Sequence, residues 1–439
     1  MDVIIRIIQV ILALSLLVLV HEFGHYIFAK LFKIRVEKFY LFFPPAIFKY
    51  KPRKSDTEFG IGMIPLGGFC KISGMIDESM DKEAMKQPPQ PWEFRTKPAW
   101  QRLFVMAGGV LMNIVLAIVL STAILFTWGE EYIKTEDAIY GVEVNNLSEE
   151  IGFRSGDRII AFDKGSLPDN FSQLQVEIVR NDISTVTVVR GNDTLDIKID
   201  PLYIPAILNT PGMFLMRTPI AVGGIPDTSI NFNSGLQMGD KIIKVGQSSA
   251  MFYKELQSSL LPFADSSTTM TVNRNGEQLQ FPINVNKEGK AEIFLQSDIS
   301  GINITQHQFS LFEAIPAGFA RTFETLGNYI KELGLIFSPK TEAYKSVGSF
   351  ISIGQIFPKS WNWEIFWNIT ALLSVMLAVM NLLPIPALDG GHILFTLFEM
   401  ITGRKPSVKF MEIAQITGMI FLLLLMFFAF GNDIMRLVR

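Results

Sequence analysis

Cysteine and histidine are scarce in this chain of 439 residues, which holds one cysteine, Cys70, and four histidines. A single cysteine excludes an intramolecular disulfide and a zinc site built from several cysteines. Three of the four histidines stand in two short motifs, His21 and His25 in the first and His392 in the second. The few histidines are therefore concentrated where a metal or catalytic site would need them.

Charged residues are also few, at 18% of the chain, and the net charge is only -3. This balance, together with the lack of a basic aromatic module, argues against a nucleic-acid partner. Apolar residues make up 49% of the chain and the mean hydropathy is +0.30, which is typical of membrane proteins. The lipid bilayer is therefore the first partner that the sequence predicts.

Four stretches are long and apolar enough to cross a bilayer as helices, which takes about 20 residues each. A cleaved signal peptide is a weak alternative for the first stretch, because it lacks a basic start and a small-residue cleavage site. The four stretches run from about Val3 to Ala29, Leu103 to Trp128, Ile365 to Leu388 and Ile413 to Phe430.

The charges that flank these stretches predict an orientation. Lysine and arginine outnumber acidic residues between Lys30 and Arg102, and again between Arg404 and Lys409, whereas the long segment 129–363 is acidic overall. Basic loops next to membrane spans face the cytoplasm. We therefore expect the long segment and both chain termini to lie outside the cytoplasm.

The long outer segment contains a repeat. Gly152–Ile160 (GFRSGDRII) recurs 83 residues later as Gly235–Ile243 (GLQMGDKII), and strand-like stretches follow each copy. Gly-Asp before β-branched residues indicates a turn that enters a strand, so the two copies predict tandem β-rich domains of about 80 residues each. The pattern resembles that of PDZ domains, which bind peptide C-termini at a sheet edge. Two unrelated β domains are the alternative, and the pair could equally act as a size filter.

The segment His21-Glu22-Phe23-Gly24-His25 follows the pattern H-E-x-x-H at the end of the first apolar stretch. On a helix, residues four apart share a face, so both imidazoles can bind one metal ion. Glu22 is offset from them and can reach a water on that ion. Zinc lowers the pKa of such a water to about 7, and a glutamate can take its proton during attack on a carbonyl. Ionisable groups at membrane depth are costly unless they bind something, so a match without a metal is unexpected.

A catalytic zinc needs a third protein ligand. One candidate is Asp389, within Asn381–His392 (NLLPIPALDGGH) at the end of the third apolar stretch. Pro384 and Pro386 prevent a regular helix there, and irregular backbone at membrane depth occurs only inside protein or beside water. From the residues alone, Asp389 could instead cap the next helix, and His392 could compete as the ligand.

HEFGH in the first apolar stretch and N-x-x-P-x-P-x-L-D-G in a later one together resemble the site-2 protease family of intramembrane metalloproteases. The resemblance covers nearly the whole chain. It implies one Zn²⁺ per chain, bound by His21, His25 and Asp389, with Glu22 as the general base. The other residues that it implies are substrate-positioning groups and an amide for the developing oxyanion: Asn381, Pro384, Pro386, Gly67 and Gly68 for the first role, and Asn113 for the second. Packing between helices is the alternative role for Asn113.

The resemblance completes the expected architecture. We expect a multi-pass α-helical membrane protein with four transmembrane helices, a membrane-associated β-hairpin and two tandem PDZ-like β-rich domains outside the cytoplasm. The expected segments are transmembrane helices at 1–30, 103–128, 364–388 and 411–432, a cytoplasmic-side β region at 31–102, PDZ-like domains at 129–215 and 216–300, an amphipathic juxtamembrane segment at 301–363 and a cytoplasmic loop at 389–410.

These features predict an intramembrane zinc endopeptidase in the inner membrane of a bacterium, with its active site toward the cytoplasmic side. The resemblance implies single-span membrane substrates already shortened outside, such as an anti-sigma factor or a signal-peptide remnant. Two other classes fit less well. A non-proteolytic binding protein would be expected to have lost a ligand or Glu22, and a transporter would be expected to contain an inverted repeat.

Overall fold

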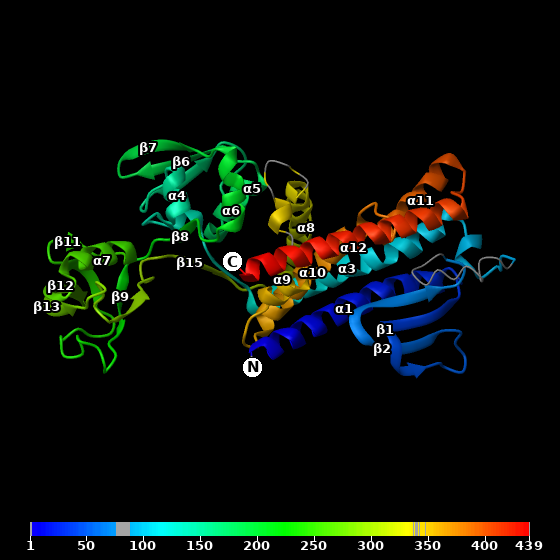
Figure 1. Cartoon of the computed structure of the whole chain (residues 1–439), viewed down its shortest axis with the longest axis horizontal. Helices are drawn as coiled ribbons and strands as arrows, with labels where there is room; N and C mark the ends of the chain where they lie inside the picture. Colours follow the sequence, from blue (N-terminus) through cyan, green and yellow to red (C-terminus); the bar gives the residue numbers. More distant parts are fainter. Residues whose placement is uncertain are drawn as a thin grey trace. The chain divides into compact units, whose positions relative to one another are not determined.

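The computed structural model describes residues 2–438 except 76–87, 337, 339, 340, 342 and 347. The chain divides into two compact units, Met1–Glu130 with His307–Arg439, and Glu131–Gln306. The first unit holds the long apolar helices and a hairpin, and the second is rich in β-strands (Figure 1). Parts of the segments predicted at 31–102 and 301–363 lie outside the described residues.

Long helices dominate the first unit. Four of them, α1, α3, α10 and α12, are long and apolar enough to cross a membrane within the described ranges. They coincide with the four predicted spans and mark the chain as a membrane protein. The helices of this unit are α1 (Asp2–Leu31), α3 (Ala99–Trp128), α8 (Leu311–Ile336), α9 (Phe350–Ile356), α10 (Trp363–Leu382), α11 (Asp389–Thr402) and α12 (Val408–Val438), with 3-10 helices η1 (Phe94–Thr96) and η6 (Ala343–Ser346).

The outward faces of the spanning helices are apolar. Ile4 on α1 is 61% exposed, and Leu424 and Phe427 on α12 are 63% and 67% exposed. Contiguous apolar surface on this scale is unusual for a protein in water. It is the surface that a helix needs in contact with lipid, so the exposure pattern agrees with the hydropathy.

Helices α1 and α3 cross at glycines. A Cβ on Gly24 would lie 2.1 Å from the carbonyl oxygen of Gly108, and a Cβ on Gly108 would lie 2.7 Å from the carbonyl oxygen of Gly24. Small residues at a membrane helix crossing let two backbones approach closely. The crossing brings α3 against the face of α1 that carries His21 and His25.

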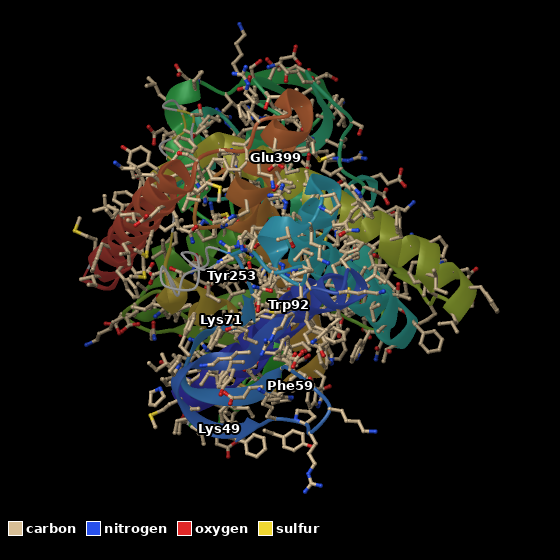
Figure 2. The ribbon with its side chains drawn as sticks, turned by 90° about the vertical axis from the view of Figure 1, so that its right-hand side faces the viewer. Lys49, Phe59, Lys71, Trp92, Tyr253 and Glu399 are labelled. Carbon is tan, nitrogen blue, oxygen red and sulfur yellow. The ribbon has the colours of Figure 1, made fainter. Side chains whose placement is uncertain are left out.

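Strands β1 (Val36–Tyr50) and β2 (Glu58–Ile72) form the predicted hairpin, paired antiparallel with several register shifts. Lys49 and Phe59, labelled in Figure 2, come from the two strands next to the turn. The first part of β2 is paired with β1 on both sides, since Phe59 lies opposite both Phe39 and Tyr50. Gly68 lies opposite Leu41 alone, so at that point the second edge of β2 has no partner among the described strands. The base of the hairpin joins α1 and α3 in one apolar cluster of Ala29, Ile34, Val36, Ile72, Phe94, Val105 and Met106.

The stretch predicted as a cytoplasmic loop at 389–410 begins with the helix α11. This helix packs on α3, and its Glu399 pairs with Arg102 of α3 at 2.5 Å. The predicted span at 364–388 ends early as a helix, at Leu382. Pro384 and Pro386 account for this end, because neither has the N–H that a continuing helix needs.

The second unit is built from short strands and helices. The strands are β3 (Glu130–Ile133), β4 (Val142–Val144), β5 (Arg158–Phe162), β6 (Thr185–Arg190), β7 (Asp193–Lys198), β8 (Phe214–Met216), β9 (Ile220–Gly224), β10 (Lys241–Val245), β11 (Ser248–Ser249), β12 (Ser266–Arg274), β13 (Glu277–Val285), β14 (Phe294–Ser297) and β15 (Ile304–His307). The helices are α4 (Asn146–Ile151), α5 (Leu174–Arg180), α6 (Ile204–Asn209) and α7 (Tyr253–Leu260), with 3-10 turns η2 (Thr135–Asp137), η3 (Phe171–Gln173), η4 (Pro201–Tyr203) and η5 (Leu261–Phe263).

The two copies of the repeat have the same strand order. The second copy forms the sheet β13-β12-β10-β9-β14, and the first forms β7-β6-β5 and β4-β8, which is the same order in two pieces. Asp157 and Asp240, the aspartates of the two Gly-Asp pairs, each accept two hydrogen bonds at 2.6–2.8 Å from an arginine, Arg190 and Arg274 respectively. The recurring Gly-Asp therefore anchors equivalent strands in both copies.

Candidate active site

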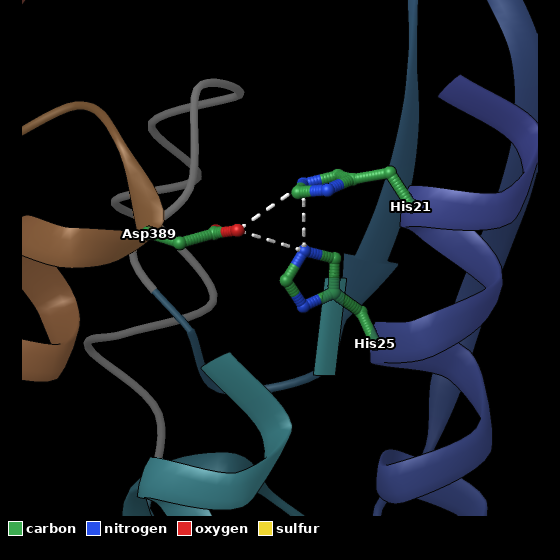
Figure 3. A group of neighbouring side chains, drawn as sticks. All are labelled: His21, His25 and Asp389. Atoms are coloured by element: carbon green, nitrogen blue, oxygen red, sulfur yellow. Dashed lines mark hydrogen bonds and ion pairs between the residues drawn. The ribbon is translucent and has the colours of Figure 1, made fainter. Parts of the chain in front are cut away.

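The three predicted ligands lie together although they are far apart in the sequence. His21 Nε2 and His25 Nε2 lie 3.1 and 3.3 Å from Asp389 Oδ2, and 3.3 Å from each other (Figure 3). The histidines come from successive turns of α1, and Asp389 begins α11 across from them. In the part of the chain that the structure describes, these side chains form the cluster of His, Cys, Asp or Glu that can hold a metal ion.

The spacing of the three ligand atoms fits tetrahedral zinc. Zinc lies about 2.0–2.1 Å from an imidazole nitrogen and about 2.0–2.2 Å from a carboxylate oxygen, so two ligands at tetrahedral positions are about 3.3 Å apart. The three distances here agree with that value. Asp389 Oδ2 is fully buried and, within the described residues, has the two imidazole nitrogens beside it and no hydrogen-bond donor. A buried carboxylate oxygen without a donor is placed to bind a cation.

Each imidazole is oriented through its second nitrogen. His25 Nδ1 lies 2.8 Å from the carbonyl oxygen of Val105 on α3, so Nδ1 carries the proton and donates it. His21 Nδ1 lies 3.1 Å from the side-chain amide of Asn113, also on α3. A histidine that binds a metal through Nε2 carries its proton on Nδ1 and needs an acceptor there. Helix α3 therefore turns both Nε2 atoms toward the carboxylate.

Gly109 on α3 leaves the space that the two rings occupy. A Cβ at this position would lie 2.5 Å from His21 Cε1 and 2.7 Å from the Nε2 atoms of both His21 and His25. Contacts this short would push the imidazoles away from Asp389. The glycine is thus required by the ligand geometry itself.

The segment between α10 and α11 aims Asp389 at the histidines. The N-cap of α11 is Leu388, with no side-chain cap, so Asp389 is not the helix cap that the residues alone allowed. Ala387 has a φ of 104°, a conformation that is rare outside glycine, and such strain gathers at functional sites. A Cβ on Gly390 would lie 2.2 Å from the carbonyl oxygen of Leu383, so this turn requires glycine.

A cavity of about 580 Å³ opens at the ligand atoms. Pro384 and Pro386 are absent from its lining, so they act on it through the segment that ends at Asp389. His392 lines the cavity without belonging to the ligand cluster. The predicted residues that line the cavity are His21, Glu22, His25, Gly67, Gly68, Asn381 and Asp389.

Glu22 faces the cavity beside the ligands rather than joining them. The backbone N–H of Cys70 on β2 donates a hydrogen bond to its carboxylate, and a Cβ on Gly68 would lie 3.7 Å from its Cγ. Strand β2 is therefore directly next to the predicted general base. A carboxylate held here can act on a water molecule in the cavity.

Asn113 lies beside the Nδ1 atom of His21. Its side chain is fully buried, contacts His21 and does not line the cavity. An oxyanion donor must point at the substrate carbonyl. The structure places the Asn113 side chain against a predicted metal ligand, and the oxyanion role that the resemblance implied stays a prediction.

Ala387 and Gln415 are among the lining residues that the sequence analysis did not single out. Gln415 is an amide inside an apolar stretch, and polar residues at membrane depth are costly and often functional. The sequence therefore contained a signal that could have marked Gln415 as a site residue. Ala387 offered no signal, because alanine rarely takes a positive φ.

Comparison with known proteins agrees with this geometry. The family model described as Peptidase family M50 matches residues 9–425. The chain belongs to peptidase family M50. A regulator of sigma E protease from Haemophilus influenzae is 27% identical over 97% of this chain and 98% of its own length. Provisionally named zinc metalloproteases from Thermotoga maritima and Pasteurella multocida are 25% and 28% identical, over 98% and 97% of this chain and 99% and 98% of their own lengths.

Membership in family M50 confirms the resemblance to the site-2 proteases that the two motifs predicted. The two motifs and their order in the chain also predict similarity to the regulator of sigma E protease, RseP, and the Haemophilus influenzae relative confirms this similarity. This M50 peptidase is a metalloprotease. The roles of its individual residues stay predictions that rest on the geometry above.

Proposed function

We propose that this M50 peptidase is an intramembrane zinc endopeptidase that cuts a membrane-spanning segment of its substrate. The observation that carries the proposal is the meeting of two imidazoles and a carboxylate, at tetrahedral spacing, beside a cavity among helices apolar enough to span a bilayer. The metal of this chain is zinc, as the family and the names of its relatives indicate. The three ligands together would bind one zinc ion per chain.

The roles of the residues follow from where they stand. His21, His25 and Asp389 would hold the zinc ion, which would supply Lewis-acid chemistry for a peptide carbonyl and a water molecule. Glu22 takes the proton of the attacking water and delivers it to the leaving amine. The Cys70 N–H keeps the Glu22 carboxylate turned toward the cavity.

The substrate must be unwound before it is cut. A helix hides its peptide bonds because its backbone groups bond to one another, and those groups need new partners once they are freed in a membrane. The free edge of β2 around Gly67 and Gly68 can supply partners by strand addition. Asn381 lines the same cavity and offers an amide donor and acceptor for the same purpose.

Asn113 supports a metal ligand in this proposal. Its amide nitrogen faces His21 Nδ1, and its amide oxygen is buried with no partner among the described residues. With zinc on Nε2, the proton on Nδ1 needs an acceptor, so the amide must present its oxygen instead. The two amide orientations have nearly the same shape. Asn113 is then a positioning residue that holds the His21 ring.

Substitutions at Asn113 separate this role from an oxyanion role. Asn113→Asp keeps an acceptor and is expected to retain zinc, whereas Asn113→Leu is expected to weaken zinc binding about 10–100-fold. Competition with a chelator measures the zinc affinity of both variants without reference to proteolysis. Unchanged zinc affinity in both variants, with the larger loss of kcat in Asn113→Asp, would instead indicate an oxyanion donor, because the added charge repels an oxyanion.

We propose that the protein lies in the inner membrane of a bacterium, with the β-rich unit and both termini outside the cytoplasm. The support is the excess of lysine and arginine that flanks the hairpin, since such segments stay in the cytoplasm. His21 precedes Lys30 by nine residues, or about 13 Å of helix. This depth supports cleavage in the cytoplasmic half of the bilayer.

We propose that the β-rich unit is a pair of PDZ-like domains, on the support of their shared strand order. A peptide bound by such a domain adds to a sheet edge, and in the second domain β14 pairs with β9 alone among the described strands. In the first domain Gln175 on α5 bonds to the backbone of Ile207, Thr210 and Met213, so the chain's own α6 is held against α5 in that domain. We infer that a peptide C-terminus binds the second domain.

The proposed substrates are single-span membrane proteins already shortened outside the membrane, of the kind left from an anti-sigma factor or a signal peptide. The name of the Haemophilus influenzae relative supports the first kind. The β-rich unit would then act as a filter that excludes intact outer domains. The proposed partners are therefore these substrates, the lipid bilayer and a peptide C-terminus.

A reconstituted assay tests the proposed function. Protein in liposomes is expected to cut a single-span substrate with a short outer part and to spare the same span joined to a folded outer domain. Cleavage is expected to stop when a chelator removes the metal and to return with added Zn²⁺. Cleavage that survives metal removal would contradict the zinc proposal, and equal cleavage of both substrates would contradict the filter.

A further inference from the structure

Helix α12 carries a polar residue where its surroundings are apolar. Many described residues of α12 are exposed and apolar, but Gln415 is only 7% exposed and lines the cavity beside the ligand cluster. It is a side chain of the last spanning helix, far in sequence from both active-site motifs. Its presence in the cavity wall therefore needs an explanation of its own.

Two contacts fix α12 in place. Gly418, three residues after Gln415 and on the same face, is so close to the segment before Asp389 that a Cβ there would lie 1.4 Å from the carbonyl oxygen of Pro386. At the other end, Asp433 accepts hydrogen bonds from the backbone and the hydroxyl of Ser349 at 2.8 and 2.5 Å. Gln415 is therefore held at the cavity by packing on the metal-site segment.

The amide of Gln415 makes no hydrogen bond to any described residue, and the cavity is what it faces. Gln9 on α1 offers a contrast, because it is fully buried and its amide nitrogen donates to the carbonyl oxygen of Pro358 at 3.0 Å. An amide buried without a partner is costly. The donor and the acceptor of Gln415 are thus free for a molecule that enters the cavity.

An unwound substrate needs such a partner. An extended strand presents backbone N–H and C=O groups along both of its edges, and each of these groups must be satisfied when water is scarce. The edge of β2 can pair with only one of the two edges of the substrate strand. The uncharged amides in the cavity lining, those of Asn381 and Gln415, are suited to the second edge, because each offers one donor group and one acceptor.

We propose that Gln415 is a substrate-positioning residue that bonds to the backbone of the unwound substrate segment, on the edge that β2 does not reach. The inference rests on the proposed function. It extends substrate recognition to the last spanning helix and predicts recognition through the backbone, independent of the substrate side chain at that position.

Binding measurements test this role apart from catalysis. We would use the full chain carrying Glu22→Gln, reconstituted in micelles, and a labelled synthetic single-span peptide. A series of peptides replaces one amide at a time by an ester near the scissile bond, which removes one N–H and weakens one carbonyl. In the Glu22→Gln protein, adding Gln415→Met is expected to weaken binding of the parent peptide about tenfold, or ~1.4 kcal/mol. One ester peptide lacks the backbone group that Gln415 would bind, so adding Gln415→Met is expected to change its binding by less than about twofold.

The matched control is Thr417→Val, on an exposed part of the same helix, where the hydroxyl bonds only to the carbonyl of Ile413. It is expected to leave peptide binding and zinc content unchanged, and Gln415→Asn is expected to recover part of the lost binding. Unchanged binding in Gln415→Met, an equal loss for every ester peptide, or loss of zinc would each overturn the inference. Failure of the wild type to cut the parent peptide would instead overturn the proposed function.

Discussion

Replacing Glu22 by glutamine is expected to lower cleavage of a membrane substrate by about 10³-fold, within the range for loss of a general base. The amide has nearly the shape of the carboxylate but cannot take a proton from water. The Glu22 side chain lies beside the ligands rather than among them, so the variant is expected to keep its zinc. The measurement is the initial rate of cleavage of a tagged single-span protein in liposomes, with the zinc content of the same preparation.

A matched control for Glu22→Gln is Glu364→Gln. Glu364 lies in the first turn of α10, is exposed and does not line the cavity. Its replacement makes the same chemical change and is expected to leave cleavage unaltered. Undiminished cleavage by Glu22→Gln would contradict the assignment of Glu22 as the general base, whereas loss of zinc would show that Glu22 helps to hold the metal.

Replacing Asp389 by alanine is expected to remove the metal. Its Oδ2 is the oxygen that lies 3.1 and 3.3 Å from the two Nε2 atoms, and without it only the two imidazoles remain to bind the ion. Loss of a group that merely orients a ligand costs about 10–100-fold in metal affinity, so loss of a ligand is expected to cost more. Zinc content after dialysis against a chelator, with cleavage measured in parallel, tests this expectation.

His392→Ala is the matched variant for Asp389→Ala. His392 lies one turn later on α11 and also lines the cavity, but it is outside the ligand cluster. The variant is expected to retain zinc. The reverse pattern, with zinc kept by Asp389→Ala and lost by His392→Ala, would make His392 the third ligand.

The ligand set was predictable from the sequence only in part. Residues four apart on a helix share a face, so the pairing of His21 with His25 follows from local geometry. The third ligand lies on another helix, and local rules left Asp389 and His392 open. A resemblance between whole motifs favoured Asp389. The structure supplies the physical reason, because the turn at Ala387 and Gly390 aims the carboxylate at the imidazoles.

Residues that act through long-range packing could not be placed from the sequence. The contact of Asn113 with His21 depends on a close crossing of α1 and α3 at Gly24 and Gly108. The place of Gln415 depends on the contact of Gly418 with the segment before Asp389. Hydropathy locates each of these helices, but it does not say which face of one meets which face of another.

The fold, like the site, was predictable from the sequence only where the signals are local. Spans and the repeat follow from hydropathy and from recurring Gly-Asp, which are local signals. The arginines that hold those aspartates, Arg190 and Arg274, stand more than 30 residues after them and became recognisable only in the folded sheets. Helix α11 was assigned to a loop because its apolar stretch is too short to cross a bilayer.

The most direct test of the account is the identity of the bond that is cut. Mass spectrometry of a reconstituted single-span substrate, compared between the wild type and Glu22→Gln, would locate it. The account predicts one internal bond within the apolar span, in its cytoplasmic half, cut by the zinc-loaded wild type and left intact by the variant. A cut in the flanking aqueous segment, or the same fragments from both proteins, would contradict it.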